Sequence, residues 1–470
     1  MVVVWSALRW SGTWPFGSDN DEYRLVSEEL LRSGRPVVAD VEATKYPLGY
    51  PLVLSLLDVV GLPVTRAALA LNVGLVAALA AVVVQLSRSL GQRWAAVPAA
   101  ICAVAGAGLW GSVFVTMPDL AFLVASAAIV WQVGRLRSAG DVWVLVALVA
   151  VSTSLKSVGL LLAVAAAVAV LVAERPLRGL AWTPPAAAVA LTAAMTALNA
   201  PHPEHTTGYA RTFMLVDPTD ATAGEVDVGG LLSRLPDRAH LVLRDAEVAV
   251  VGQHVTRPLS WLVVLVGLGA GVWAMWAVTT RRAYVLSFLA IWLPAMALWP
   301  YSSVRFQLPL VVIAAIGVGH LAGVAARAGP VGTAAVALVV ALNLWGQAGQ
   351  VIRDADFEER TIGVVAADTE AAAAWGAENV PSGDVIASFA YREVAHRLDR
   401  SVVPLGYTSD VSSLLEEADA AGARWLVVMP SLYRARGQLE ERFVTAFPDR
   451  LRLAHDTTTV DTYELLPASG

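Results

Sequence analysis

The sequence has little charge and a single cysteine, and both scarcities exclude classes of protein. Charged residues make up 15% of its 470 residues and hydrophobic residues 57%, whereas soluble domains are about 25% charged and about 45–50% apolar. This composition excludes a purely soluble enzyme and a disordered chain, and it indicates a protein that crosses the bilayer several times. The net charge of −6 provides no basic surface of the kind that nucleic acids need, so we expect no nucleic-acid partner.

Metal-binding side chains are equally sparse. Cys102 is the single cysteine, which excludes an intramolecular disulfide and a cysteine-rich metal site. The set His202, Glu204 and His205 lies between prolines with no clear fourth ligand, and a solvated loop explains it better than a metal does. We therefore expect neither a metal nor a cofactor.

Apolar runs dominate the chain instead. About 20 apolar residues cross about 30 Å of hydrocarbon, and we expect about ten to eleven spans in all. The candidate runs are residues 67–86, 94–112, 118–134, 142–155, 157–173, 180–200, 259–279, 283–299, 306–326 and 331–347. The fourth and fifth are short and meet at Lys156, as a re-entrant or tilted segment would. Residues 1–10 would rise only about 15 Å as a helix, so we expect them to end a first span that starts upstream of this reading frame.

The short connections indicate an orientation in the plasma membrane. Lysine and arginine in short loops accumulate on the cytoplasmic side. Alternate counting of the spans puts one set of basic residues on that side: Arg88, Arg93, Arg135, Arg137, Arg175, Arg178, Arg281, Arg282 and Arg327. The opposite, extracytoplasmic face then receives residues 11–65, residues 201–257 and everything after residue 347.

The end of the chain has the pattern of an α/β domain. Short apolar strands at residues 384–389, 401–405, 424–429 and 459–465 alternate with helical stretches at 368–378, 411–421 and 433–446. No glycine-rich phosphate loop follows these strands, so we expect no nucleotide there. We thus predict a helical transmembrane domain over residues 1–350, with external loops 11–65 and 201–257, and an extracytoplasmic α/β domain over residues 351–470.

The first external loop carries an acidic helix. Apolar residues at helical spacing in residues 17–34 predict an amphipathic helix on the membrane surface. Three acids crowd its first turn: Asp19, Asp21 and Glu22. A capping box between Ser18 and Asp21, together with the helix dipole, explains Asp21 and Glu22 as well as a site does. It explains Asp19 less well, because Asp19 also begins a longer pattern.

Three basic residues lie on the face where short connections normally avoid them. They are both lysines of the chain, Lys45 and Lys156, and Arg305. A negatively charged ligand on this face would account for them. Two alternatives remain open, namely that Arg305 reaches to lipid phosphates and that Lys156 marks a simple helix break.

Several motifs together resemble a known family. Asp19-x-x-x-Tyr23, a leucine-rich helix ending in Gly34, and Lys45-x-Pro47-x-x-Tyr50 resemble the first external loop of the GT-C membrane glycosyltransferases, especially protein O-mannosyltransferases and aminoarabinose transferases. The resemblance extends to Pro118-Asp119 at the head of a span, Leu155-Lys-Ser-Val-Gly159 between two spans, and Arg305-Phe-Gln-Leu-Pro309 at the start of a late one. It covers nearly the whole chain.

The resemblance implies transfer of a sugar, hexosyl or pentosyl, from a polyprenyl-phosphate donor to an acceptor on the outer face. In it Asp19 would be the general base, worth about 10²–10⁴ in rate, with Asp21 beside it. Lys45, Arg305 and Lys156 would hold the donor phosphate, which needs no metal. Further candidates for substrate binding are Glu22, Tyr50, Asp119 and Tyr301.

The substrate-binding candidates have ordinary explanations too. Thr116 and Pro118 would cap the third span next to Asp119, and Tyr50 and Tyr301 suit a membrane interface. Two other classes of protein also remain: a transporter or flippase of lipid-linked substrates, which would place charges near the midplane, and a non-catalytic membrane scaffold. The acceptor, whether protein, lipid or polysaccharide, is not specified by the sequence.

Overall fold

The chain folds into two compact units. The computed structural model describes residues 18–38, 42–43, 46–91, 95–105, 116–199, 214–217, 220–251, 257–299, 304–334, 336–338, 340–341, 344–345, 363–395, 397–398, 400–405, 410–429 and 434–467. Unit 1 comprises Tyr46–Leu198 and Leu231–Asp354 together with Met1–Thr13, and unit 2 comprises Trp14–Lys45, Asn199–Gly230 and Ala355–Gly470. Each unit is described by itself.

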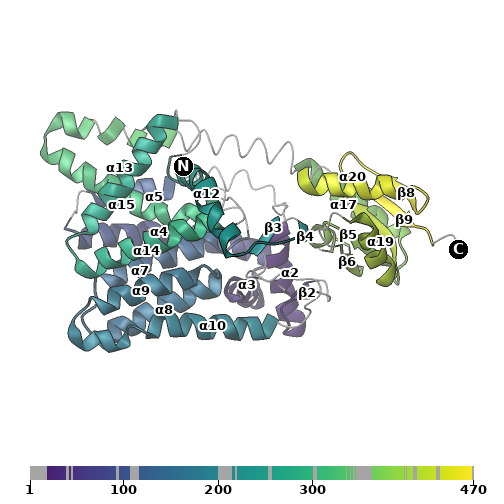
Figure 1. Ribbon diagram of the computed structural model, residues 1–470, viewed down its shortest axis with the longest axis horizontal. Coiled ribbons are helices and arrows are strands. Elements are labelled where there is room, and N and C mark those ends of the chain that lie inside the picture. The colour runs from purple at the N-terminus through teal and green to yellow at the C-terminus, as the bar shows by residue number, and fades with distance from the viewer. Residues whose placement is uncertain are drawn as a thin grey trace. The chain divides into compact units, whose positions relative to one another are not determined.

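Unit 1 is a bundle of apolar helices. Its helices are α3 (Gly49–Val59), α4 (Val64–Ser89), α5 (Ala96–Ala105), α7 (Asp119–Val133), α8 (Ala139–Leu155), α9 (Gly159–Leu171), η1 (Arg175–Leu180), α10 (Thr183–Asn199), α12 (Val228–Val250), α13 (Arg257–Met275), α14 (Thr279–Leu298), η2 (Val304–Gln307) and α15 (Leu308–Arg327). Helix α7 packs between α4 and α8, and α9 between α8 and α14 (Figure 1).

Each predicted run between residues 67 and 326 contains a helix. Within the part of the chain that the structure describes, four helical segments are long and apolar enough to cross a membrane by length and composition: Arg66–Ser89, Arg175–Leu198, Thr279–Leu298 and Val304–Arg327. Six shorter apolar helices accompany them. The prediction of a many-helix membrane domain is thus confirmed as a fold, whereas the number of spans and their orientation stay predictions.

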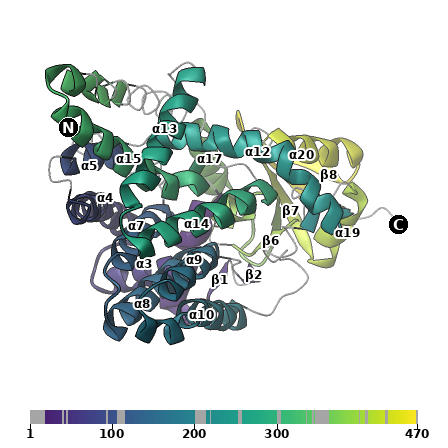
Figure 2. The same ribbon diagram turned by 60° about the vertical axis from the view of Figure 1, so that its left-hand side comes forward.

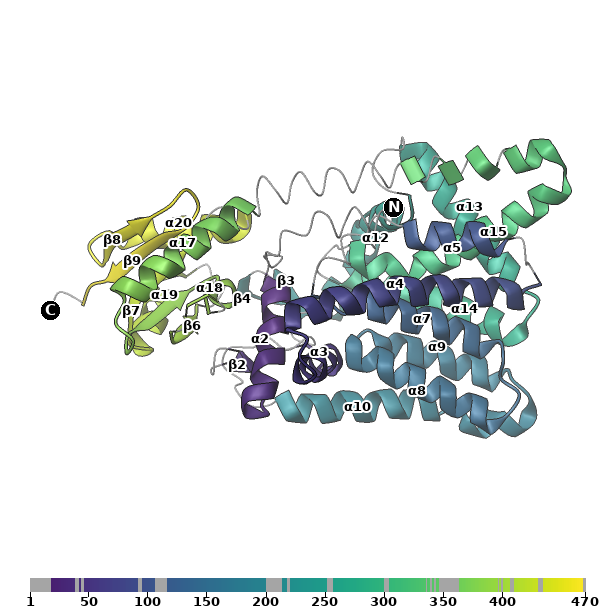
Figure 3. The same cartoon turned by 180° about the vertical axis from the view of Figure 1, so that it is seen from behind.

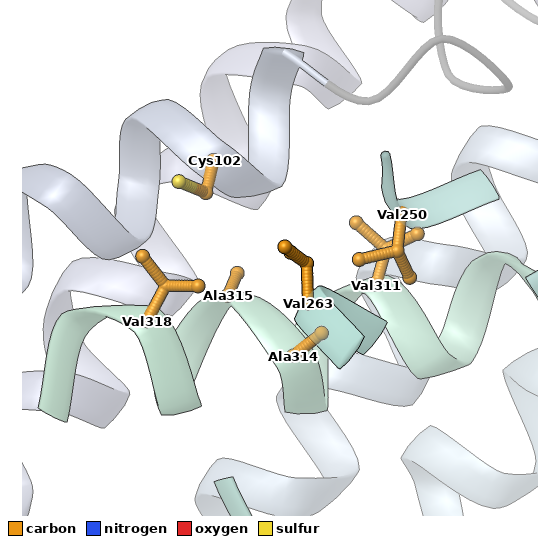
Figure 4. Close-up of a pocket in the computed structure, with 7 residues that line it drawn as sticks. All are labelled: Cys102, Val250, Val263, Val311, Ala314, Ala315 and Val318. Carbon is orange, nitrogen blue, oxygen red and sulfur yellow. The ribbon is translucent and has the colours of Figure 1, made fainter. Parts of the chain in front are cut away.

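Small residues bring α13 and α15 into close contact (Figure 2). A Cβ atom on Gly317 would lie 1.9 Å from the carbonyl oxygen of Gly267, and one on Gly271 would lie 2.1 Å from that of Ile313. Such close backbone contacts need glycine. The van der Waals packing that they allow favours association of helices in lipid, where the hydrophobic effect does not drive it. Beside this crossing lies a small apolar pocket, shown in Figure 4 and lined by Cys102, Val250, Val263, Val311, Ala314, Ala315 and Val318.

The segment predicted as a long loop, residues 201–257, contains regular structure. Strands β3 (Leu215–Asp217) and β4 (Asp220–Glu225) form an antiparallel pair, and α12 follows over 23 residues. Helix α12 was not predicted from the sequence because Pro236 lies inside it, and a proline normally marks a helix boundary. Its second half is nonetheless buried from Asp245 to Val250, so tertiary packing stabilises the helix.

Unit 2 is built on a five-stranded sheet (Figure 3). Its strands are β5 (Val385–Ser388), β6 (Val402–Pro404), β7 (Ala423–Val428), β8 (Leu451–Asp456) and β9 (Asp461–Leu465), in the order β6-β5-β7-β9-β8. The first three are parallel, and β7, β9 and β8 are antiparallel neighbours. The predicted α/β pattern is confirmed. The sequence missed β8, whose central residues are exposed and therefore show no apolar alternation.

Helices cover both faces of this sheet. Helices α19 (Val411–Ala420) and α20 (Arg434–Ala446) pack on one face, where Leu426 and Phe443 belong to the same core. On the other face α17 (Gly363–Asn379) places Trp375 against Trp425, with ring centroids 5.9 Å apart. The side chains of Trp425 and Leu426, successive residues of β7, therefore point to opposite faces of the sheet, as strand geometry requires.

Unit 2 also contains the acidic amino-terminal helix. Helix α2 (Ser18–Ser33) confirms the predicted helix, and β1 (Val37–Val38) pairs with β2 (Glu42–Ala43) after it. The apolar residues Tyr23 and Val26 are buried, and α2 contacts the short helix α18 (Tyr391–Ala395). Its location on a membrane surface stays a prediction.

Candidate functional site

A buried ion pair joins two helix ends in unit 1. Asp119 is the first residue of α7, and the ammonium group of Lys156 donates a hydrogen bond to its carboxylate. The side chains are only 1% and 12% exposed, respectively. Burial of a charge is costly unless an opposite charge compensates it, so each residue explains the presence of the other. The carboxylate also lies at the positive end of the α7 dipole, which favours it further.

Lys156 reaches this position because the chain breaks between α8 and α9. Helix α8 ends at Leu155, and Lys156 has extended backbone angles, φ −146° and ψ 135°. The N–H of Gly159 donates to the carbonyl of Lys156 at 2.8 Å, which closes a tight turn. A Cβ on Gly159 would lie 2.6 Å from the nitrogen of Thr153, so the turn requires glycine. The helix break therefore places Lys156 where its ammonium group meets Asp119.

Aromatic rings complete the surroundings of Lys156. Its Nζ lies 5.8 Å from the ring centroid of Phe122 and 5.1 Å from that of Phe306. Phe122 stacks on Trp292 of α14 with centroids 6.2 Å apart. Faces of aromatic rings attract cations while excluding water, so the ammonium group lies in a partly dry environment in which electrostatic interactions are strong.

Arg305 shares Phe306 with Lys156. Arg305 and Phe306 both belong to η2, and the guanidinium carbon of Arg305 lies 5.5 Å from the Phe306 centroid. The Nη1 atom of Arg305 lies 3.0 Å from the sulfur of Met117, just before α7. Phe306 therefore contacts two cations, and Met117 and Asp119 bring the start of α7 to the same place. We call Asp119, Lys156, Arg305 and Phe306 the cation cluster.

Helix α3 closes one side of this region. Tyr50 is fully buried, and its hydroxyl donates to Oδ1 of Asn72 on α4 at 3.5 Å. A Cβ on Gly49 would lie 2.5 Å from Oγ of Ser154 and 2.6 Å from its carbonyl oxygen, so α3 touches the last turn of α8, two residues before Lys156.

The structure thus gathers three sequence-predicted candidates, Lys156, Arg305 and Asp119, from segments far apart in the chain. One alternative is wrong: Thr116 does not cap α7, whose N-cap is Pro118 without a side-chain hydrogen bond. Asp119 instead compensates Lys156. Tyr50 is a core residue held by Asn72, and its substrate role stays a prediction.

The remaining candidates belong to unit 2 or fall outside the described residues. Glu22 is a buried residue of α2 in unit 2. The backbone of Asp19 and Asp21 lies in α2, whereas their side chains, and the whole of Lys45 and Tyr301, fall outside the described residues. The same holds for His202, Glu204 and His205. Within the described part of the chain, no three side chains of His, Cys, Asp or Glu gather as metal ligands would.

Sequence reasoning missed the rings that hold the cluster together. Phe122 and Phe306 are apolar residues of predicted spans, and nothing in the local pattern of Phe122 indicates a charged neighbour. Phe306 does follow Arg305 directly, and this adjacency was the one available signal.

Comparison with known proteins identifies the fold. No protein-family model matches the chain, and no curated protein matches it in sequence. Among solved structures, ArnT from Cupriavidus metallidurans bound to undecaprenyl phosphate matches with a TM-score of 0.61 and 13% identity, over 99% of this chain and 98% of that chain. The archaeal oligosaccharyltransferase AglB from Archaeoglobus fulgidus, in complex with an inhibitory peptide and a dolichol-phosphate, matches with a TM-score of 0.57 and 13% identity, over 100% of this chain and 74% of that chain. At such identities the likeness is one of fold.

Proposed function

We propose that this chain, which has the GT-C fold of membrane glycosyltransferases, transfers a sugar from a polyprenyl-phosphate donor to an acceptor on the extracytoplasmic face. The observation that supports this proposal most is the cation cluster, in which Lys156 and Arg305 flank one ring beside a buried carboxylate. Two solved structures of this fold contain undecaprenyl phosphate and dolichol-phosphate. A lipid phosphate is the anion that such a cluster suits.

In the proposed reaction the acceptor oxygen attacks the anomeric carbon of the donor sugar. Asp19 takes the proton of the acceptor hydroxyl as this bond forms, with Asp21 beside it. The bond from the anomeric carbon to the phosphate oxygen breaks, and its electron pair leaves with the lipid phosphate. Direct displacement of this kind inverts the anomeric centre.

The cation cluster serves the leaving group. Negative charge grows on the phosphate as the bond breaks, and Arg305, Lys156 and Lys45 would stabilise it. One unit-charge pair at 4 Å is worth about 4 kcal/mol at an effective dielectric near 20. Asp119 partly neutralises Lys156, so its role in this proposal is to hold the ammonium group in place. Arg305 then carries more of the phosphate charge.

In this proposal the extracytoplasmic α/β domain, residues 351–470, and the segment 201–257 govern access of the acceptor. Tyr301 and Glu22 contact the substrate. A transporter or flippase and a silent scaffold are the competing classes.

The test is turnover of a panel of polyprenyl-phosphate sugars by membranes that carry the wild type or Asp19→Asn. We expect consumption of one donor by the wild type and a loss of about 10²–10⁴ in the variant, with equal amounts of folded protein. Equal consumption by both would remove Asp19 as the base. Consumption by neither would favour the transporter or the scaffold, and uptake of labelled lipid into vesicles would separate those two.

A further inference from the structure

Helix α12 is bonded to the end of α14, next to the cation cluster. The guanidinium Nη1 of Arg238 donates a hydrogen bond to the carbonyl oxygen of Trp299. Trp299 is the C-cap of α14. Carbonyl groups at a helix C-terminus have no partner within the helix and attract cations, so this bond satisfies the helix end and fixes α12 on it.

The Trp299 side chain continues this contact to the cluster. Its ring meets Phe306 edge to face, with centroids 6.1 Å apart at an interplanar angle of 73°. Phe306 in turn lies 5.1 Å from Nζ of Lys156 and 5.5 Å from the guanidinium carbon of Arg305. One line of contacts therefore runs from Arg238 through Trp299 and Phe306 to both cations.

Two further contacts hold α12 in place. Glu247 is 7% exposed, and Nε1 of Trp261 on α13 donates to its carboxylate at 2.6 Å. Val250, the last residue of α12, lines the apolar pocket beside Val263 and Val311 (Figure 4). Helix α12 thus contacts α14 through Arg238, α13 through Glu247, and the pocket between α13 and α15 through Val250.

We propose that Arg238 is a positioning residue for donor binding: it holds Trp299, whose ring sets the place of Phe306 and thereby the spacing of Lys156 and Arg305. This proposal rests on the proposed function and assigns α12 to the donor side of the reaction. Two cations bind one phosphate only if their spacing suits it. A displacement of a binding group by about 1 Å can lower the reaction rate by up to about 10²-fold. Arg238 itself does not touch the donor in this account.

The test compares Arg238→Gln with Arg244→Gln. Arg244 is an exposed residue of the same helix, and its substitution removes the same charge without the bond to Trp299. For each full-length variant we would measure KM and kcat for the donor, the Kd for sugar-free undecaprenyl phosphate, and the Tm. We expect Arg238→Gln to raise KM and Kd about tenfold with a smaller effect on kcat, since a charged hydrogen bond is lost. Arg244→Gln should stay within about twofold.

Two more variants test the line of contacts from Arg238 through Trp299 and Phe306 to the two cations. Arg238→Lys should recover part of the affinity, because an ammonium group can donate to the same carbonyl. Phe306→Leu should weaken phosphate binding, and adding Arg238→Gln to it should have little further effect, because both act through one contact line.

The outcomes separate this inference from the proposed function. If the wild type binds undecaprenyl phosphate without transferring any sugar, and Arg238→Gln weakens that binding, positioning stands and the proposed transfer falls. If Arg238→Gln lowers only the Tm and leaves Kd and KM unchanged, or if the effects of Arg238→Gln and Phe306→Leu add fully, Arg238 is a structural residue and the inference is overturned.

Discussion

Lys156 and Arg281 are basic residues of unit 1 whose side chains are largely shielded from solvent, and they are compensated in different ways. Lys156 pairs with the carboxylate of Asp119 and lies near two aromatic rings. Arg281 is 1% exposed, and the residues next to it in the sequence include no acid. Its Nη2 donates to Oγ of Ser89 at 2.7 Å and to the carbonyl of Trp131 at 3.5 Å. These two acceptors lie at the ends of α4 and α7.

The difference separates a site from a structural contact. Helix C-termini attract cations through fixed backbone dipoles, so Arg281 joins α4, α7 and α14 in an arrangement that no ligand needs to enter. A side-chain carboxylate can share its lysine with a second anion, and Lys156 keeps some exposure. Helix α7 takes part in both arrangements: Asp119 is its first residue, and the carbonyl of Trp131 near its end accepts a hydrogen bond from Arg281 of α14. Burial of a charge alone thus does not identify a site; the type of compensation does.

The strongest way to break the comparison is Asp119→Ala. The substitution leaves Lys156 buried without its carboxylate, and loss of one member of a buried pair costs about 3–5 kcal/mol. We expect a fall of that size in the free energy of unfolding, measured in detergent, and loss of donor turnover. The control is Asp119→Ala with Lys156→Met, which should regain most of the stability but none of the turnover. Recovery of turnover in the double variant would contradict a donor role for Lys156.

A pair of glycine substitutions sharpens the comparison. A Cβ on Gly49 meets Ser154 at 2.5 Å, close to Lys156, whereas a Cβ on Gly134 meets Nε of Arg281 at 2.1 Å. Overpacking of this kind costs about 1–3 kcal/mol. We expect Gly49→Ala and Gly134→Ala to lower the Tm similarly, but only Gly49→Ala to lower turnover per folded molecule. Gly74→Ala, which has no atom within 4 Å of the new Cβ, is the matched control; equal turnover losses in both test variants would remove the distinction.

The smallest expected effect is that of Arg281→Met. The substitution leaves the Trp131 carbonyl and the Ser89 hydroxyl without their donor, but it also removes the cost of burying a guanidinium group. We expect a net destabilisation of about 1 kcal/mol and unchanged KM and kcat for the donor. Thermal unfolding and donor kinetics on one preparation test both expectations. A selective rise in KM would show that Arg281 also serves the substrate.

Much of the fold could be predicted from particular segments. The run at residues 118–134 predicted α7 closely, and residues 411–421 predicted α19, because apolar periodicity and composition are local properties. Helix α12 was missed because Pro236 interrupts its pattern, while contacts with α13 and α15 help to bury its second half. Strand β8 was missed because an edge strand with exposed residues lacks alternation.

The candidate site was predictable in its charges but not in its contacts. Lys156 and Arg305 were identifiable because the predicted orientation puts them on a face that short loops seldom make basic. Asp119 was also a candidate, but its local sequence suggested a helix cap with Thr116. Its true partner lies 37 residues away, and no local pattern indicates such a pairing.

The sequence by itself determined that this chain is a bundle of apolar helices with an α/β domain at its end, because hydrophobicity and its period act over a few neighbouring residues. The tertiary structure alone decided that Asp119 meets Lys156, that Phe306 lies against two cations, and that Arg238 reaches Trp299. These contacts depend on which helices become neighbours, and that choice is made by the summed packing of the whole unit, including glycine contacts such as Gly267 with Gly317.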